Sequence, residues 1–392
     1  MRRSPVALGF MALFAIIVGV TVLGVAENWP RSRTIATPGA LRQPQLLKAH
    51  VVALRTQRCR VPSMHGCSEV TVKLDEGPAK GHTTSFAYGD TGGNASIGLG
   101  DGVLVTKNQI PTGAVAAGGG HLEQYSFADF QRGHALLVLL LLFAAIAVVG
   151  GRLHGLRALF GLAASLATVV FFVVPAIVDG RPPLQVAAFG GLGVMLLSIP
   201  LVHGGGAKSL AACVGTAGAL LLTLALADVF THAAHLSGLT SDEALYLQAT
   251  THVSLLGLLL AGMVIGSLGV LGDTTVTQAS TVMALRRANP QLGFAGLVQH
   301  ATAVGRDHIA ATVNTLVLAY TGAALPTLII FSLANTSVIR GATTEAVAEA
   351  VVATLVGSIG LILAVPATTA LAALLALHLP ERALRHAHAH AH

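Results

Sequence analysis

The feature that most constrains this chain is a series of apolar stretches of about 20 residues that carry no charged side chain. A helix of that length crosses the hydrocarbon core of a bilayer, which is about 30 Å thick. Charged residues make up 10% of the sequence and its mean hydropathy is +0.73, whereas charged residues make up about 25% of an ordinary soluble domain. The chain is therefore predicted to be an α-helical polytopic membrane protein with the lipid bilayer as its main surroundings.

Eight predominantly apolar stretches are near the length that a membrane span requires. The predicted spans are residues 6–26, 134–150, 156–178, 184–202, 210–230, 253–271, 310–334 and 347–377. The first has an alternative interpretation, because Gly24-Val25-Ala26 is a tolerable signal-peptidase site. Its apolar core is longer than the 7–15 residues usual in a signal peptide, which favours an uncleaved anchor over residues 1–26.

Basic residues are distributed unequally over the loops between these spans. With a cytoplasmic N-terminus, the short outer loops receive only Arg181 and Arg340. The inner side receives Arg2, Arg3, Arg152, Arg157, Lys208, Arg286, Arg287, Arg306, Arg382 and Arg385. The positive-inside rule then predicts a bacterial cytoplasmic-membrane protein with both termini in the cytoplasm. Because this accounts for the net charge of +6 and aromatic residues are only 5% of the chain, nucleic acid is not an expected partner.

Residues 27–130 differ from the rest in having no long apolar run. Short β-branched stretches such as "SEVTVKL" and "GVLVTK" alternate with Gly, Pro, Asp and Asn, which predicts a small extracytoplasmic β-rich, OB-like domain after the first span. Cys59 and Cys67 lie in this exported segment, where a disulfide closing a short loop is expected and two free thiols are the alternative. The remaining domains are a seven-helix membrane domain, 131–378, and a cytoplasmic His-rich tail, 379–392.

A dense polar segment follows the predicted span 253–271. Asp273 is succeeded by Thr274, Thr275, Thr277, Gln278 and Ser280. In one interpretation this is a broken or re-entrant helix whose carboxylate and hydroxyls line a watery cavity and coordinate a cation or proton. In the other, Asp273 is the N-cap of a cytoplasmic helix over 274–288 that ends with Arg286 and Arg287.

The start of the next span adds polar residues at the same predicted membrane boundary. In "GRDHIAATVNT", Asp307 and Asn314 share one helix face, with Thr315 and His308 beside it. Two consecutive spans thus place carboxylates, hydroxyls and an amide at one boundary. The candidate transport-lining residues are Asp273, Thr275, Thr277, Gln278, Asp307, Asn314 and Thr315.

Metal ligation is a further possibility in two places. Asp228, His232 and His235 have the i, i+4, i+7 spacing that would bring them together on a continuous helix, and Asp with His suits Zn²⁺. If the helix ends near Phe230, they are ordinary loop residues. The alternating histidines of the tail "HAHAHAH" resemble a weak chelator, or a low-complexity end without that role.

Two blocks resemble the most recognisable segments of the YibE/F-like membrane proteins. They are "LLLAGMVIGSLGVLGDTTVTQASTVMALRRANP" and "GRDHIAATVNTLVLAYTGAALPTLIIF", and "YSFADFQR" and "SDEALYLQA" are similar to that family in order and spacing. The resemblance implies a multi-pass protein with a β-rich extracytoplasmic domain, described in places as a permease and without an established substrate. It also implies a pair of acidic residues where this chain has Gly272-Asp273, so a divalent-ion role carried by such a pair would be weaker here.

These observations predict a permease or permease component for an ion or small polar solute. The alternative is a membrane sensor or accessory subunit that binds a ligand or partner through its extracytoplasmic domain. No Gly-x-Ser-x-Gly elbow or His-Glu-x-x-His pair is present, so neither an enzyme nor a cofactor is expected. Small residues recur on helix faces, which suits close helix packing and a homo-oligomer as a possible assembly.

Overall fold

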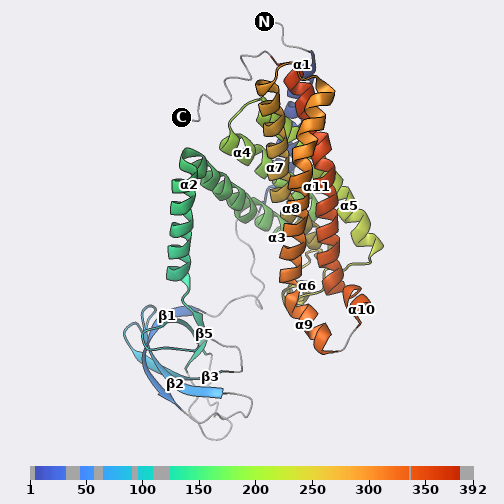
Figure 1. The fold of residues 1–392 in the computed structure, drawn as a ribbon. Coiled ribbons are helices and arrows are strands. Elements are labelled where there is room, and N and C mark those ends of the chain that lie inside the picture. The colour runs from blue at the N-terminus through green and yellow to red at the C-terminus, as the bar shows by residue number, and fades with distance from the viewer. Residues whose placement is uncertain are drawn as a thin grey trace. The chain divides into compact units, whose positions relative to one another are not determined.

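The computed structural model describes residues 5–31, 45–56, 65–90, 96–108, 124–334 and 337–379. It divides into two compact units, Met1–Ala36 with Ala147–His392, and Thr37–Ile146 (Figure 1). The first is helical, and the second is a β-sheet followed by the beginning of a helix. Each unit is considered by itself.

The chain is mostly helical. The helices are α1 (Pro5–Glu27), α2 (Gly133–Thr168), the π-helical turn η2 (Val169–Val173), α3 (Val174–Val178), α4 (Pro183–His203), α5 (Ala207–Ala233), α6 (Asp242–Thr250), α7 (Leu255–Ala288), α8 (Phe294–Ala323), α9 (Leu325–Leu333), α10 (Val338–Ala342) and α11 (Glu345–Leu377). Within the described residues, six helical stretches are long and apolar enough to cross a membrane. A seventh results if α8 and α9, which meet at a bend of 59°, form one span. The prediction of a polytopic helical membrane protein agrees with these lengths and compositions.

The predicted spans 134–150 and 156–178 lie in one helical stretch of 46 residues, Gly133–Val178. A straight helix of that length would measure about 69 Å, more than twice a hydrocarbon core. The helix is instead broken at Arg152, whose φ of 48° and ψ of −129° are not helical. The break therefore lies between the two stretches that the sequence separates.

The β-unit is a five-stranded antiparallel sheet in the order β3-β2-β1-β4-β5. Its strands are β1 (Leu46–Thr56), β2 (His65–Leu74), β3 (Thr83–Asp90), β4 (Gly102–Lys107) and β5 (Tyr125–Phe130). Alternate apolar residues of these strands form a core of their own, with Ala49, Val70, Val72, Val103 and Val105 fully buried. The edge strands β3 and β5 approach each other, because the Tyr88 and Phe127 ring centroids lie 5.1 Å apart. The sheet is therefore curled. The prediction of a small β-rich domain agrees with this unit.

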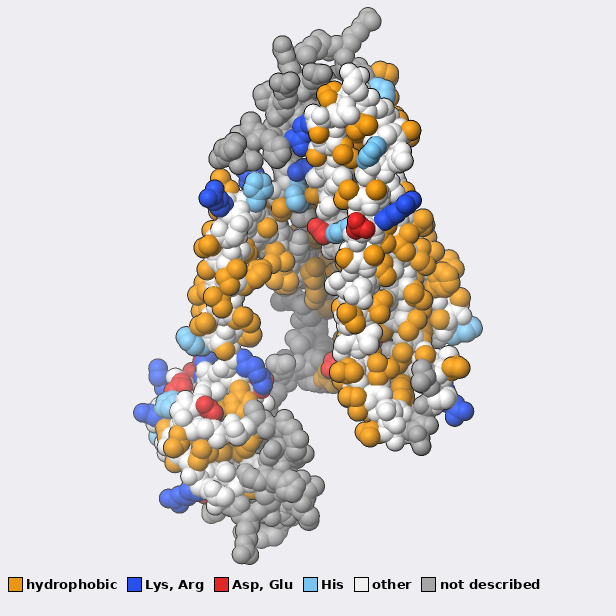
Figure 2. Space-filling model, viewed as in Figure 1, with side chains coloured by type: hydrophobic (Ala, Val, Ile, Leu, Met, Phe, Trp, Pro, Cys, Tyr) orange, Lys and Arg blue, Asp and Glu red, His pale blue; other side chains and the backbone are white. Residues whose placement is uncertain are grey.

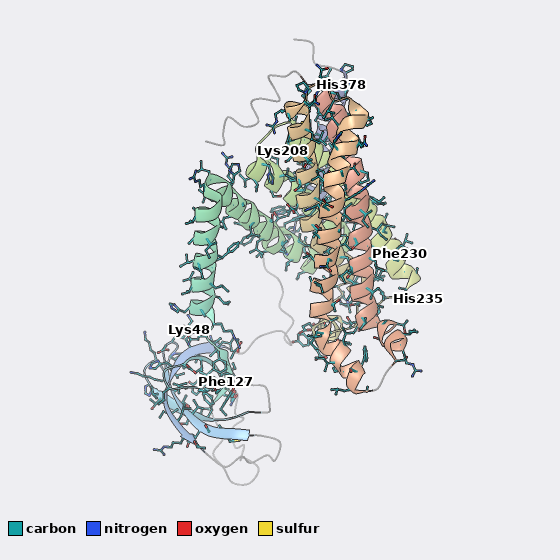
Figure 3. The ribbon with its side chains drawn as sticks, viewed as in Figure 1. Lys48, Phe127, Lys208, Phe230, His235 and His378 are labelled. Carbon is teal, nitrogen blue, oxygen red and sulfur yellow. The ribbon has the colours of Figure 1, made fainter. Side chains whose placement is uncertain are left out.

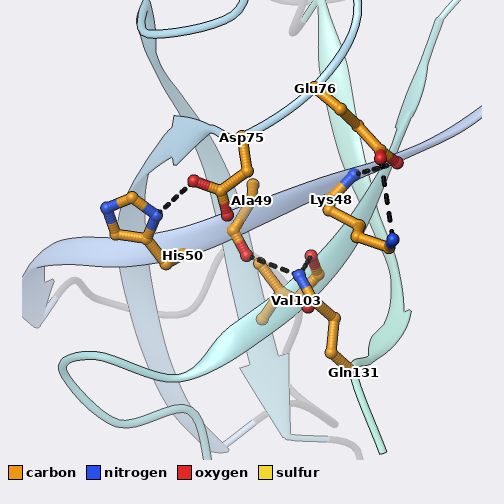
Figure 4. A network of polar contacts seen from close by, with 7 residues as sticks. All are labelled: Lys48, Ala49, His50, Asp75, Glu76, Val103 and Gln131. Atoms are coloured by element: carbon orange, nitrogen blue, oxygen red, sulfur yellow. Dashed lines mark hydrogen bonds and ion pairs between the residues drawn. The ribbon is translucent and has the colours of Figure 1, made fainter. Parts of the chain in front are cut away.

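A polar network ties the end of this sheet to the beginning of α2. Gln131, two residues before α2, donates hydrogen bonds from Nε2 to the carbonyl oxygens of Ala49 at 3.0 Å and Val103 at 2.9 Å (Figure 4). These oxygens belong to the paired strands β1 and β4. Since Gln131 clamps both strands, the first part of α2 is held to the sheet, which explains why 37–146 behave as one unit.

The helical unit is built around α5, α7 and α11, which pack on one another and on α4 and α8. Their contact surfaces are rich in Ala, Gly and Thr, which allow close approach of the backbones. Helix α1 packs against α4 and α5: Phe10 is buried in the main core, and Trp29 stacks on Phe172 with ring centroids 5.7 Å apart.

Candidate functional site

Helix α7 is one unbroken helix from Leu255 to Ala288, so both interpretations of the segment after Asp273 need correction. The segment is not a broken or re-entrant helix, and Asp273 is not an N-cap. The cap is Ser254, whose Oγ accepts a hydrogen bond from the Gly257 backbone N–H at 3.1 Å. Tertiary packing on α5, α8 and α11 holds the polar residues in the helix despite their weak intrinsic helix preference.

The polar half of α7 extends past the end of α4. Asp273 lies beside His203, the last residue of α4, since both line one cavity. From Asp273 to Ala288 the helix continues for about 22 Å at 1.5 Å per residue. The whole of α7 is about 51 Å long, well beyond the thickness of a hydrocarbon core. The second half of α7 therefore continues past the end of α4, where it packs against α5, α8 and α11.

A buried polar layer joins α5, α7 and α11 within this extension. Two hydrogen-bonded pairs cross between helices: the Oγ1 atoms of Thr216 and Thr275 lie 2.5 Å apart, and Thr369 Oγ1 donates to Gln278 Oε1 at 2.9 Å. All four residues have no exposed surface. We call these four residues, with Thr274 and Thr368, the buried polar layer. Two of its members are Thr275 and Gln278, which the sequence indicates as candidates.

Several polar atoms of this layer have no partner. Gln278 Nε2, Thr274 Oγ1 and Thr368 Oγ1 are buried without a hydrogen bond among the described residues. Each unsatisfied buried polar group lowers the stability of the fold by about 1–3 kcal/mol. A layer with three such groups therefore does more than hold the helices together. Glycines make room for them: a Cβ at Gly305 would lie 2.7 Å from Gln278 Nε2, and one at Gly215 would lie 2.2 Å from Thr368 Oγ1.

A cavity of about 500 Å³ lies beside this layer. Apolar and small residues of α2, η2, α4 and α7 form most of its lining, among them Leu166, Val173, Met195, Gly269 and Gly272. Its polar lining comprises Ser165, Ser198, His203, Thr216 and Asp273. Thr216 belongs both to the cavity wall and to the buried polar layer, so the cavity reaches this layer at Thr216.

Asp273 also lies close to α8. His308 Nε2 is 3.9 Å from Asp273 Oδ2. The Asp273 side chain is 75% exposed, while His308 Nε2 is buried and has no hydrogen bond. Figure 2 shows acidic, basic and histidine side chains gathered in one band across the helical unit, with hydrophobic surface beside it. Of the polar residues at the predicted start of that span, His308 is the one that lies near Asp273.

The other candidates lie elsewhere. Asp307 and Asn314 are exposed on the face of α8 opposite its buried residue Gly305, and Thr315 is exposed further along the helix. Thr315 Oγ1 donates to the Ala311 carbonyl of its own helix at 3.0 Å. Thr277 is partly buried and outside the cavity lining. The position of Asp307 around the helix axis explains why it lies apart from Asp273. Arg306 and Asp307 are both exposed, on the side of α8 that points away from α7 and α11.

The three predicted metal ligands do not converge. Asp228 Oδ1 and His232 Nδ1 lie 3.5 Å apart, but α5 ends at Ala233 and His235 follows in a left-handed conformation with φ of 51°. His235 is at that end of α5, near Phe230 (Figure 3). In the part of the chain that the structure describes, no three His, Cys, Asp or Glu side chains form a metal-sized group. Helix α5 ends before His235, as in the alternative interpretation, and the three side chains therefore do not share one helix face.

Two further predictions fall on residues outside the described ranges. Cys67 lies on β2, but Cys59 is outside the described residues, so the disulfide stays a prediction. The histidines of the tail are also outside them. Cys213 is buried in α5 among apolar neighbours, as a packing role requires.

The sequence did not indicate Thr216, Thr368 and Thr369 as part of the site. Thr216 stands alone in an apolar helix, and Thr368 and Thr369 are an adjacent pair in another. Such threonines are common in membrane spans, where their hydroxyls often bond only to the backbone of their own helix. Thr216 Oγ1 and Thr369 Oγ1 also lie within hydrogen-bond distance of carbonyl oxygens of their own helices, 2.8 Å from Ala212 and 2.7 Å from Val365. Only the packing of the helices shows which hydroxyls also face α7.

Comparison with known proteins gives one result. A family model described as "YibE/F-like protein" matches residues 139–378. This range includes every residue of the cavity and of the buried polar layer. No curated protein and no solved structure matches the chain.

Proposed function

The chain belongs to the YibE/F-like family, and from that premise we propose that it is a permease or permease component for an ion or small polar solute. The observation that carries the proposal is the cavity of about 500 Å³ that ends on Asp273 and on the Thr216–Thr275 pair. Ionisable and unsatisfied polar groups inside a helical membrane bundle are costly, and they mark solute pathways in membrane proteins generally.

The proposed topology has eight spans. It counts the two parts of Gly133–Val178 on either side of Arg152 separately, and it counts α8 with α9 as one. With the N-terminus in the cytoplasm, Arg152, Lys208, Arg286 and Arg287 all fall on the inner side, in agreement with the positive-inside rule. The α6 end of the bundle then faces outward, both termini are cytoplasmic, and the membrane is the bacterial cytoplasmic membrane.

In this arrangement Asp273 lies at the inner boundary of the bilayer. A solute in the cavity contacts Asp273, His203 and Thr216, which all line it. Thr275 and Gln278 follow Asp273 on α7 toward its cytoplasmic end, where the buried polar layer offers hydroxyl and amide groups with unused hydrogen-bonding capacity. We assign the pathway to Asp273, Thr216, Thr275 and Gln278, without the exposed α8 residues Asp307, Asn314 and Thr315.

A second candidate function is supported by the β-unit. Its five antiparallel strands curl until β3 and β5 make contact, and we propose that it is an OB-like domain. It has its own core and is clamped to α2 by Gln131. A sensor or accessory subunit would bind its ligand or partner with this domain and transmit the event along α2.

The test of the permease proposal is flux in proteoliposomes. Purified protein is assayed with protons, divalent cations and small anions, and wild type is compared with Asp273→Asn and Gln278→Leu. Asp307→Asn is the matched control, because it removes the same charge from the exposed face of α8. Flux of one solute by wild type, lost in Asp273→Asn and kept in Asp307→Asn, would support the pathway and name its solute class.

Two results would count against it. Equal loss in Asp273→Asn and Asp307→Asn would indicate a general effect of charge at the boundary. If wild type moves none of these solutes, the sensor becomes the leading candidate, and a variant lacking residues 45–110 then tests whether a cellular response depends on the β-unit.

A further inference from the structure

A second cavity, of about 400 Å³, lies at the α6 end of the helical unit. It is enclosed by α7, α8 and α11, by the segment that joins α8 to α9, and by the loop before α6. Small and apolar residues form most of its wall, including Gly262, Ala323, Ala346, Ala350 and Ala353. Its four polar lining residues are Thr240, Tyr320, Thr327 and Glu349. The volume is in the range of small-molecule sites, about 300–1,000 Å³.

Glu349 gives this cavity an uncompensated carboxylate. Its Oε2 accepts a hydrogen bond from Thr240 Oγ1 at 2.7 Å. Its Oε1 is buried and has no hydrogen-bond partner. Among the described residues no Lys, Arg or His side chain forms an ion pair with it. An ionised carboxylate in such a place is costly unless a cation or hydrogen-bond donor reaches the free oxygen.

A neighbouring carboxylate strengthens the negative charge without neutralising it. Glu345, one turn earlier on α11, accepts hydrogen bonds from Ser237 Oγ at 2.7 Å, from the Ser237 N–H and from the Gly238 N–H at 3.1 Å. It therefore anchors the loop that presents Thr240, and it is not part of the cavity lining. Glu345 uses its Oε1 in this structural role, whereas Glu349 lines the cavity and its Oε1 has no hydrogen bond among the described residues.

We propose that this cavity binds a small organic cation, a protonated primary amine, through Glu349. The ammonium group pairs with the Glu349 carboxylate, the hydroxyls of Tyr320 and Thr327 are available to a further polar group, and the small apolar residues of α8 and α11 contact the hydrocarbon part. A divalent metal fits less well, because it requires several oxygen ligands and no three acidic or histidine side chains converge in the described residues.

This inference concerns binding and does not depend on transport. The cavity shares no lining residue with the one that contains Asp273. An amine site at the α6 end is therefore compatible with a permease, where it would lie on the outer side, and equally with a sensor. Flux through the Asp273 pathway and binding at Glu349 are measured separately, so that either can fail while the other holds.

The experiment is isothermal titration of the full chain in lipid nanodiscs at neutral pH. The probes are butylammonium chloride, the uncharged 1-butanol of nearly the same size, NaCl and MgCl2. We expect saturable binding of butylammonium and none of 1-butanol. Glu349→Gln should weaken butylammonium binding at least tenfold, because it keeps the size of the side chain and removes its charge.

Asp242→Asn is the matched control. Asp242 is an exposed carboxylate in the first turn of α6, outside the cavity lining, so its loss should leave the affinity unchanged. The inference is overturned if wild type does not bind butylammonium, if Glu349→Gln binds it equally well, or if MgCl2 or NaCl binds there in its place. Should Glu349→Gln not fold, the comparison of butylammonium with 1-butanol on wild type still decides whether the site requires a positive charge.

Discussion

Thr216 on α5 and Thr275 on α7 place their Oγ1 atoms 2.5 Å apart, and neither side chain has exposed surface. Each hydroxyl also lies within reach of a carbonyl of its own helix, Ala212 at 2.8 Å and Gly272 at 3.1 Å. Two hydroxyl protons are thus shared among three contacts, so only two of the contacts are hydrogen bonds at any one time. One threonine donates across to the other helix while the second donates to its own backbone, and the roles can exchange.

The shared hydrogen bond predicts non-additive mutations. Thr216→Val and Thr275→Val keep the shape of the side chain and remove its hydroxyl, so each should lower the free energy of unfolding. Because either change already abolishes the hydrogen bond between the helices, the double variant should cost less than the sum, with a coupling energy of about 0.6 kcal/mol. A double-mutant cycle by denaturant unfolding in detergent measures this, and strict additivity would show that the pair contributes nothing.

Gly305 predicts a strong effect of a single methyl group. A Cβ at this position of α8 would lie 2.6 Å from Val365 Cγ1 and 2.7 Å from Gln278 Nε2. Gly305→Ala should therefore push α8 away from α7 and α11 and destabilise the chain by about 1–3 kcal/mol.

The control for that variant is Gly218→Ala on α5, where an added Cβ would meet nothing within 4 Å. Alanine is the better helix former, so this change should be neutral or stabilising by up to about 1 kcal/mol. Thermal unfolding of both variants in detergent tests the pair. Similar melting temperatures would mean that α8 does not pack on Gln278 as described.

The sequence indicated the membrane class, the β-unit and the position of the Arg152 break because these depend on local properties. Apolar length, which separates the spans 134–150 and 156–178 on either side of Arg152, is readable from the chain itself. The beginning of α8 was not indicated: the predicted span starts at residue 310, but the helix starts at Phe294. Residues 294–309 are too polar to count as membrane-spanning, and their helix is stabilised by packing on α7 and α11.

The candidate site was predicted in part, because only some of its residues stand out in the local sequence. Asp273, Thr275 and Gln278 were indicated by the density of polar residues in one segment of α7. Their partners Thr216 and Thr369 come from helices 59 and 91 residues away in sequence, and no local pattern distinguishes them from other threonines in spans. Asp307 and Asn314 share a face as periodicity indicates, but periodicity does not say whether that face turns inward.

The packing of α1 predicts that the first span is kept in the mature protein. Phe10 is buried in the main core, and a Cβ at Gly24 would lie 2.2 Å from Phe189 Cδ1 of α4. Removal of a signal peptide after Ala26 would withdraw these contacts and leave α4 and α5 uncovered. The intact mass of the purified protein should therefore include residues 1–26. A mature chain that begins at Glu27 would contradict this, and would remove the cytoplasmic N-terminus from the proposed topology.

The cysteines give a prediction that separates the disulfide from free thiols. A Cys59–Cys67 bond closes a loop of nine residues and should stabilise the β-unit by about 2–3 kcal/mol. Cys213 is buried in α5, with no exposed surface. We expect no alkylation by a maleimide in the folded protein. Denaturation without reductant should expose one thiol, that of Cys213, and denaturation with reductant should expose three. Mass spectrometry counts the adducts, and three adducts without reductant would show that Cys59 and Cys67 are not bonded.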